Sequence, residues 1–163
     1  MTEAVTFVVK HRNRGALFDA NLLLVYVVGK LDKRRLSDFG HTEQYKEEFP
    51  LIEKLVESFS ILHTTPNVLT EVSNLGSKLG PSFFDLLQRV VTKLDEQYCA
   101  SKDAVGDPHF RKLGLTDAAL IVGAKSLVVT LDAALHSILR ARKIDAVNYH
   151  HFREDYWSGR IRL

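Results

Sequence analysis

The chain has 163 residues, of which 45% are hydrophobic and 26% are charged, and these ordinary globular values exclude disordered and collagen-like classes. The formal charge of +2 is too small to indicate nucleic-acid binding by itself. Cys99 is the single cysteine, so an internal disulfide and a zinc site built from several cysteines are excluded.

The first residues, MTEAVTFVVKHRNRG, lack the charged and then apolar layout of a secretory signal. The longest aliphatic and aromatic run, Leu22 to Val28, has seven residues, whereas a membrane span needs roughly 20. We therefore expect a cytoplasmic protein with no membrane partner. A single domain is expected over residues 1–163, with 1–14 as an N-terminal extension and 153–163 as a C-terminal tail.

The first half of the chain gives mixed signals. The β-branched residues of Val5 to Val9 predict a strand, so residues 1–14 would add an edge strand. The apolar run at 22–28 fits a strand or a buried helix equally well by periodicity. Residues 31–48 are polar and predict a loop with a solvated helix start, and Pro50 predicts the first turn of the next helix.

The second half alternates between strand and helix patterns. The expected elements are a strand at Ser60–His63, a helix capped by Thr65 and begun by Pro66, a helix from Ser82 to Leu94, a helix at Gly114–Ser126, a strand at Leu127–Val129, a helix at Ala133–Arg142 and a strand at Ile144–Val147. Such alternation predicts an α/β fold in which a parallel sheet carries helices on both faces.

Four acidic residues stand at the ends of these elements. Asp19 and Asp132 each follow an apolar strand-like segment, Glu71 lies early in a helix, and Asp117 lies in the first turn of another helix, with Thr116 as the expected cap. In a parallel sheet these positions fall on one edge of the molecule. Clustered carboxylates repel one another unless a cation compensates them, and oxygen ligands suit Mg²⁺ or Mn²⁺.

Each acid also fits a structural role when it is taken alone. Asp117 and Asp132 could complement the positive end of a helix, which is worth about 0.3–1 kcal/mol. Asp19 could be a turn residue, and Glu71 could be a solvated helix residue. The helix face of Glu71 also carries Asn67, Asn74 and Lys78.

Four segments together resemble the PIN-domain ribonuclease family, and VapC-type toxins within it: LFDANLLL, TPNVLTEVSNL, GLTDAALIVGA and LVVTLDAAL. The resemblance covers about residues 16–152. It implies a three-layer α/β/α fold with a central parallel sheet of four or five strands, and it makes residues 22–28 helical.

The resemblance also implies a metal-dependent endoribonuclease that hydrolyses RNA phosphodiester bonds. Its catalytic and metal-binding residues would be Asp19, Glu71, Asp117 and Asp132, holding one or two Mg²⁺ or Mn²⁺ ions. Hydrogen bonds from three further residues would orient the carboxylates or water, namely Asn21, Thr116 and Thr130. The implied partners are an RNA substrate and, for a toxin, an antitoxin protein, and a homodimer is compatible with the family. The alternative is a non-catalytic PIN-like module that binds RNA or protein, and a DNA nuclease would use the same chemistry.

Several other features leave two interpretations open. The basic runs HRNR at 11–14, KLDKRR at 30–35 and RARK at 140–143 fit either nucleic-acid contact or solvated surface charge. The C-terminal stretch 149–163 fits either stacking on single-stranded RNA or packing on the domain or a partner, because it combines Arg153, Tyr156, Trp157, Arg160 and Arg162. His150 and His151 lack zinc-ligand spacing, and no histidine partner for Cys99 is evident.

Overall fold

The computed structural model describes residues 2–161 and 163, and their strands form one parallel sheet in the order β3-β2-β1-β4-β5. The strands are β1 (Ala16–Phe18), β2 (Leu62–Thr64), β3 (Leu94–Glu96), β4 (Leu127–Thr130) and β5 (Ala146–Asn148). β1 is central, because Ala16 is in register with Leu62 of β2 on one side and with Leu127 of β4 on the other. The predicted parallel α/β architecture is confirmed.

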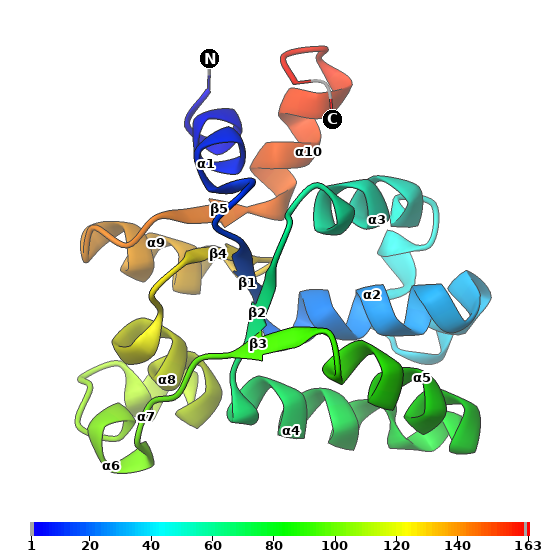
Figure 1. Ribbon diagram of the computed structural model, residues 1–163, viewed down its shortest axis with the longest axis horizontal. Coiled ribbons are helices and arrows are strands. Elements are labelled where there is room, and N and C mark those ends of the chain that lie inside the picture. Colours follow the sequence, from blue (N-terminus) through cyan, green and yellow to red (C-terminus); the bar gives the residue numbers. More distant parts are fainter. Residues whose placement is uncertain (1, 162) are drawn as a thin grey trace.

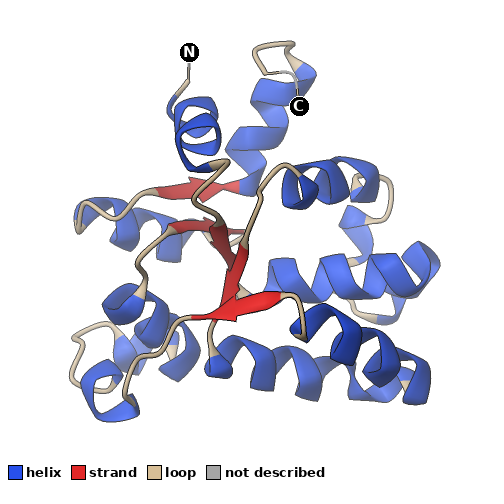
Figure 2. Cartoon of the chain, in the orientation of Figure 1, coloured by secondary structure: helices blue, strands red, loops and turns tan. Residues whose placement is uncertain are grey.

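Helices cover both faces of this sheet, as Figures 1 and 2 show. The α-helices are α1 (Glu3–His11), α2 (Ala20–Asp32), α3 (Phe49–Glu57), α4 (Pro66–Gly76), α5 (Pro81–Val91), α6 (Ser101–Ala104), α7 (Phe110–Leu113), α8 (Leu115–Gly123), α9 (Ala133–Ala141) and α10 (Tyr149–Trp157). In Figure 1, α2 to α5 lie on one side of the stacked strands and α6 to α9 on the other, while α1 and α10 lie together beside β5. The layers are therefore α/β/α.

The central strands β1 and β4 are mostly apolar because helices cover both of their faces. Leu17 of β1, Val128 of β4 and Ala16 are fully buried, and β5 is buried along its whole length. A strand that packs against helices on both faces shows a continuous apolar run rather than an alternating pattern. This burial fixes the carboxyl ends of β1 and β4, from which two of the four acids extend.

The segment at 22–28 forms the middle of α2. This helix is buried almost all round, with only Tyr26 half-exposed in that stretch, as expected for a helix at the centre of a layer. At Gly29 the helix approaches α3 so closely that an added Cβ would lie 2.0 Å from a ring carbon of Phe49. The helix that the family resemblance implies is thus confirmed.

The strand predicted at Val5 to Val9 is wrong, because these residues lie in α1. Thr2 caps the helix by accepting a hydrogen bond from the amide of Val5. Val5 and Val8, about one helical turn apart, are buried, whereas Val9 is 61% exposed. The extension at 1–14 accordingly adds a helix rather than an edge strand, and Met1 lies outside the described residues.

The end of the predicted Ser82–Leu94 helix is also wrong. The helix ends at Val91, and Leu94 begins β3, which pairs with β2 at the edge of the sheet. The other predicted elements of the second half are confirmed with small shifts of their ends: β2 begins at Leu62 and β5 at Ala146.

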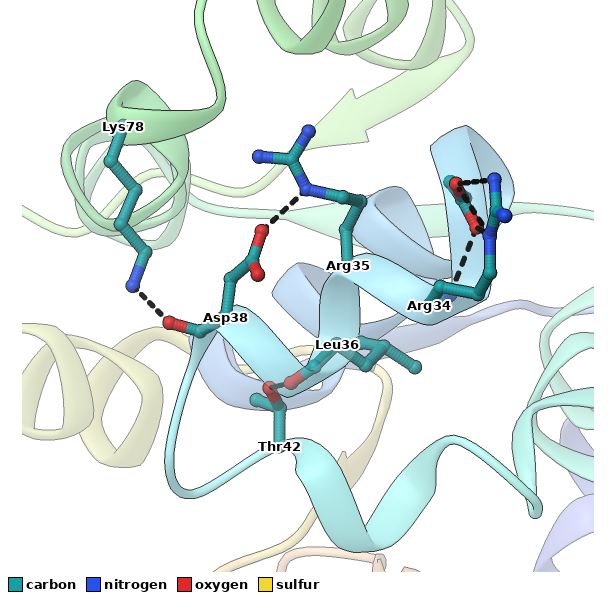
Figure 3. Close-up of polar contacts among 7 residues, drawn as sticks. Arg34, Arg35, Leu36, Asp38, Thr42 and Lys78 are labelled. Atoms are coloured by element: carbon teal, nitrogen blue, oxygen red, sulfur yellow. Dashed lines mark hydrogen bonds and ion pairs between the residues drawn. The ribbon is translucent and has the colours of Figure 1, made fainter.

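The polar segment 31–48 is more ordered than the predicted loop. Residues 31 and 32 complete α2, and two 3₁₀ helices follow, η1 (Lys33–Asp38) and η2 (Glu43–Tyr45). Leu36 and Tyr45 are buried, and the hydroxyl of Thr42 donates to the Leu36 carbonyl oxygen at 2.7 Å (Figure 3). Three apolar anchors, the third being Phe39, therefore pin a segment whose polar residues face solvent.

None of the helices in the part of the chain that the structure describes has both the length and the apolar character that a bilayer span requires.

Candidate metal and catalytic site

Asp19 and Asp132 occupy equivalent places after neighbouring strands. Asp19 follows β1 and caps α2, with its Oδ1 accepting a hydrogen bond from the Leu22 amide at 2.7 Å. Asp132 follows β4 and caps α9 in the same way, through the Leu135 amide at 2.9 Å. The chain moves outward from β1 through β2 to β3 and then returns to the other side of β1 at β4, so these two acids stand where the strand order reverses. Ligands of open parallel sheets bind at this point.

Glu71 and Asp117 come from helices that pack against each other, α4 and α8. Both side chains are half-buried, and neither carboxylate has a hydrogen-bond or ion-pair partner among the described residues. The predicted cap for α8 is wrong: Gly114, with φ of 84°, is the residue before the helix, and Thr116 lies inside its first turn. Glycine suits this left-handed conformation, and it leaves the helix without a side-chain cap.

The four acids line a single cavity of about 220 Å³. Its other lining residues are Ala20, Asn21, Leu113, Gly114, Leu115 and Thr116. This acid cavity, as we call it, therefore brings together the four predicted acids and two of the three predicted orienting residues. The lining residues include no lysine, arginine or histidine that could neutralise the acids.

Burial and mutual repulsion raise the pKa of Asp117 to about 7. Loss of solvation is the largest cause, and the negative charges of Asp19, Asp132 and Glu71 add to it. With neither a donor nor a cation beside it, the Asp117 carboxylate requires a proton or a bound cation near neutral pH.

Asp19 is 4% exposed, and burial raises its pKa as well. Three hydrogen bonds to its charged form oppose that rise: one from the Thr130 hydroxyl, one from the Leu22 amide and one from the Leu131 amide at 2.9 Å. Thr130, which does not line the cavity, thus contacts the buried acid directly. The buried Asp19 carboxylate is therefore held in place by the first turn of α2 and by the end of β4.

The chemistry of these residues fits a hard divalent cation, since Mg²⁺ and Mn²⁺ prefer carboxylate and amide oxygens. The side chains are only partly arranged for metal binding. The described residues contain no group of three or more His, Cys, Asp or Glu side chains already arranged to hold an ion. Asp19 and Asp132 direct oxygens at helix amides, whereas Glu71 and Asp117 have both oxygens free of protein donors. The latter two would be the first ligands available to a cation.

Lys78 does not join the face of Glu71 as predicted. The helix α4 ends at Gly76, and Lys78 lies in the 3₁₀ helix η3 (Ser77–Leu79). Its amino group donates to the Asp38 carbonyl oxygen and lies 3.9 Å from the centre of the Phe39 ring, and Figure 3 shows it reaching from η3 to η1. Lys78 therefore fixes the 31–48 segment instead of facing the acids.

Most cations of the basic runs are paired within the domain. Ion pairs join Lys30 to Glu53, Arg34 to Asp32, Arg35 to Asp38, Arg140 to Glu3 and Arg142 to Asp107. In the C-terminal stretch, α10 packs on the domain: Phe152 is fully buried, and Arg153 donates to Glu48 at 2.8 Å. Arg162 lies outside the described residues. Burial raises the pKa of the Cys99 thiol, which lowers its reactivity.

Sequence reasoning missed the wall of the acid cavity that Leu113 and Gly114 form at the end of α7. Asp107, buried just before this wall, pairs with Arg142 after α9 and accepts a hydrogen bond from the His109 amide at 2.8 Å. The only sequence signal for this wall is Gly114, a glycine immediately before a helix that begins with an acid in its first turn.

Comparisons of the chain with protein-family models, with curated proteins and with solved structures find no match. The resemblance to PIN-domain ribonucleases thus stays a prediction from the sequence.

Proposed function

We propose that this protein is a metal-dependent endoribonuclease that hydrolyses RNA phosphodiester bonds, with Asp19, Glu71, Asp117 and Asp132 holding Mg²⁺ or Mn²⁺. One observation carries the proposal: four carboxylates from four separate elements line one cavity whose lining includes no cationic side chain. Repulsion among clustered carboxylates lowers stability unless a cation compensates it, so the cluster favours a metal-binding role over a purely structural one.

A divalent cation in such a site supplies positive charge against the phosphate and makes water more acidic. The chain's own residues position these groups. Asp19 is held by Thr130 and by two amides, so its carboxylate has a fixed direction. Glu71 and Asp117 present free oxygens from α4 and α8. By the same resemblance, we propose that the enzyme is the toxin of a toxin–antitoxin pair, inhibited by an antitoxin protein.

The first test is cleavage of labelled RNA, with single-stranded DNA as a second substrate. We expect the purified protein to cleave RNA with Mg²⁺ or Mn²⁺ and EDTA to stop the reaction. Asp19→Asn and Asp117→Asn should lower the rate by orders of magnitude while the fold, followed by circular dichroism, is retained. Asp85→Asn is the matched control, because Asp85 is exposed on α5 and does not line the acid cavity. Equal rates for the wild type and both site variants would refute the proposal.

The second test measures metal binding without activity. A ligand at about 100 times its Kd stabilises a protein by about 2.7 kcal/mol, which raises the Tm of a domain of this size by roughly 5–10 °C. We expect Mn²⁺ to raise the Tm of the wild type and of Asp85→Asn, and to raise that of Asp117→Asn less. A Tm that Mn²⁺ leaves unchanged in all three proteins would contradict the proposed metal site.

One observation favours the second candidate, a non-catalytic module that binds RNA or protein. Asp19 and Asp132 already use their carboxylates to cap helices, a structural role that needs no metal. RNA binding without cleavage, together with a Tm that Mn²⁺ leaves unchanged, would support this candidate over the enzyme.

A further inference from the structure

A second, larger cavity of about 480 Å³ adjoins the acid cavity. We call it the side groove. The two share Glu71, Leu115 and Thr116 as lining residues, so they are continuous along α4 and the start of α8. The side groove also includes Asn67, Thr70, Asn74 and Leu75 of α4, with Pro66, Cys99 and Ser101. Its volume lies within the roughly 300–1,000 Å³ of small-ligand sites.

The polar groups of the side groove are neutral apart from Glu71, which it shares with the acid cavity. Asn67 and Asn74 stand four residues before and three residues after Glu71, so the three share one face of α4. Neither amide side chain has a hydrogen-bond partner among the described residues. Each therefore keeps a carbonyl acceptor and two N–H donors for a ligand.

The remaining surface of the side groove is partly apolar, through Leu75 and Leu115. No lysine or arginine is among its lining residues. A phosphate would gain no ion pair here, and Glu71 would repel it. The lining fits instead an uncharged, flat group that has hydrogen-bonding edges and apolar faces.

We propose that the side groove binds the base and ribose of one unpaired nucleotide of the RNA strand whose phosphate enters the acid cavity. This inference rests on the proposed function. The side groove adjoins the acid cavity at Glu71, so it would receive a nucleotide next to the phosphate that the four acids hold. Asn67 and Asn74 hydrogen-bond the edge of the base, as amides do in base recognition, and Leu75 and Leu115 contact its face.

The same geometry selects single strands over duplexes. In an RNA duplex the base edges are paired and the faces are stacked, so neither is available to a pocket beside the scissile bond. A base in a loop or a single strand can turn out of the strand and enter the groove.

The test measures RNA binding by fluorescence anisotropy, with every protein carrying Asp117→Asn and Mg²⁺ present, so that cleavage does not consume the probe. The probes are short labelled single-stranded RNAs, one homopolymer for each base, and a blunt RNA duplex of equal length. We expect Asn67→Ala and Asn74→Ala to weaken binding of at least one homopolymer by at least about fivefold each. Ser101→Trp, which places a large ring at an exposed position of the groove, should weaken binding of all the homopolymers.

Asn13→Ala is the matched control, because Asn13 is an exposed asparagine in the turn before β1, at the opposite end of the sheet. It should bind like the parent protein, and the duplex should bind more weakly than the single strands. Unchanged affinity in all three groove variants, or a duplex that binds as tightly as the single strands, would overturn the inference.

Cleavage assays on the same variants with Asp117 restored separate the two proposals. If the protein with Asp117 restored cleaves RNA and the groove variants bind RNA normally, the proposed base binding by the side groove is wrong and the proposed function stands. If the parent never cleaves but binding still depends on Asn67 and Asn74, the groove stands and the enzyme does not.

Discussion

A single hydroxyl group links the two strand-end acids. The Thr130 Oγ1 atom donates to Asp19 Oδ2 and accepts a hydrogen bond from the Asp132 amide at 2.9 Å. Thr130 is fully buried, so this hydroxyl has no water to replace either partner. One residue of β4 thus sets both the direction of the buried carboxylate and the path of the chain into α9.

At the scale of a residue, some contacts of the site are predictable from the sequence and others are not. The positions of Asp19 and Asp132 after two strands predicted that these acids share one edge, because parallel strands end there, whereas the role of Thr130 came from the family resemblance alone. The expected cap at Thr116 is wrong: α8 begins at Leu115, directly after Gly114 with its φ of 84°, so Thr116 already lies inside the first turn.

The raised pKa of Asp117 predicts a pH dependence of stability in the metal-free protein. The folded-state pKa of about 7 exceeds the ordinary value of 3.8, so between these values the folded state binds a proton that the unfolded state does not. The free energy of unfolding should therefore increase as the pH falls from about 7 towards about 4. At pH 8, Asp117→Asn should be about 1–3 kcal/mol more stable than the wild type.

The measurement is denaturant unfolding in EDTA at several pH values. The advantage of Asp117→Asn should shrink as the pH falls below about 7, because the wild-type carboxyl then becomes neutral too. Groups distant from the acid cavity titrate alike in both proteins and cancel in the difference. A difference between the two proteins that does not change with pH would contradict the raised pKa.

At the scale of elements, the N-terminal helix shows how local preference is overridden. The residues VTFVV favour a strand individually, yet the helix is anchored by the Thr2 cap and by an ion pair of Lys10 with Asp145 at 2.7 Å. Thr2 followed by Glu3, with Lys10 and His11 a few residues later, matches the charge order of a helix. These end signals, rather than the β-branched centre, would have predicted the element.

The strand β3 was missed for the opposite reason. Its three residues, Leu94, Asp95 and Glu96, contain one apolar side chain, so no strand pattern exists to be recognised. The pairing with β2 defines it, and pairing is a property of the folded chain. Strands with buried apolar runs, such as β1 and β4, were predictable because a continuous apolar sequence indicates burial.

The helical assignment of α1 predicts which valines matter. Val5→Ala and Val8→Ala should each lower the free energy of unfolding by about 1–3 kcal/mol, because both side chains are buried in the core. Val9→Ala is the matched control, since its side chain is 61% exposed and its removal should cost less than about 0.5 kcal/mol. Chemical denaturation of the three variants checks this. Sensitivity at Val5 and Val9 with tolerance at Val8 would indicate a strand.

At the scale of the whole molecule, the acid cavity depends on segments that the sheet does not organise. The sheet order supplies Asp19 and Asp132, and the packing of α4 against α8 supplies Glu71 and Asp117. The remaining wall of the acid cavity, at Leu113 and Gly114, belongs to residues 97–114, which show no clear helical or strand periodicity. Sequence reasoning could predict the acids because strand and helix ends are regular, but it could not predict this irregular segment.

The ion pair of Arg142 with Asp107 fastens that segment to α9. The Asp107 side chain is 2% exposed, so Arg142→Leu would leave a buried carboxylate without its cation. Because such a loss costs more than about 1.4 kcal/mol, we expect hydrogen exchange of the 107–114 amides to accelerate at least about tenfold. The proposed RNA cleavage should be slower as well, since Leu113 and Gly114 line the acid cavity.

Arg111→Leu is the matched control for this change. Arg111 lies on the same segment, is exposed, and forms no ion pair with the other described residues. Its loss should leave exchange at 107–114 and RNA cleavage near the wild-type values. Equal exchange rates in Arg142→Leu and Arg111→Leu would show that the ion pair does not hold the wall.

The two edges of the sheet have a consequence for self-association. An uncovered strand edge offers unpaired backbone groups to a second chain and promotes aggregation. At one edge, α1 and α10 pack against β5. At the other, β3 is only three residues long and carries Asp95 and Glu96, whose charges would face the same charges on a second copy. Helix packing thus blocks one route to edge-to-edge polymers and electrostatic repulsion blocks the other, so replacing Asp95 and Glu96 with Asn and Gln would open only the second.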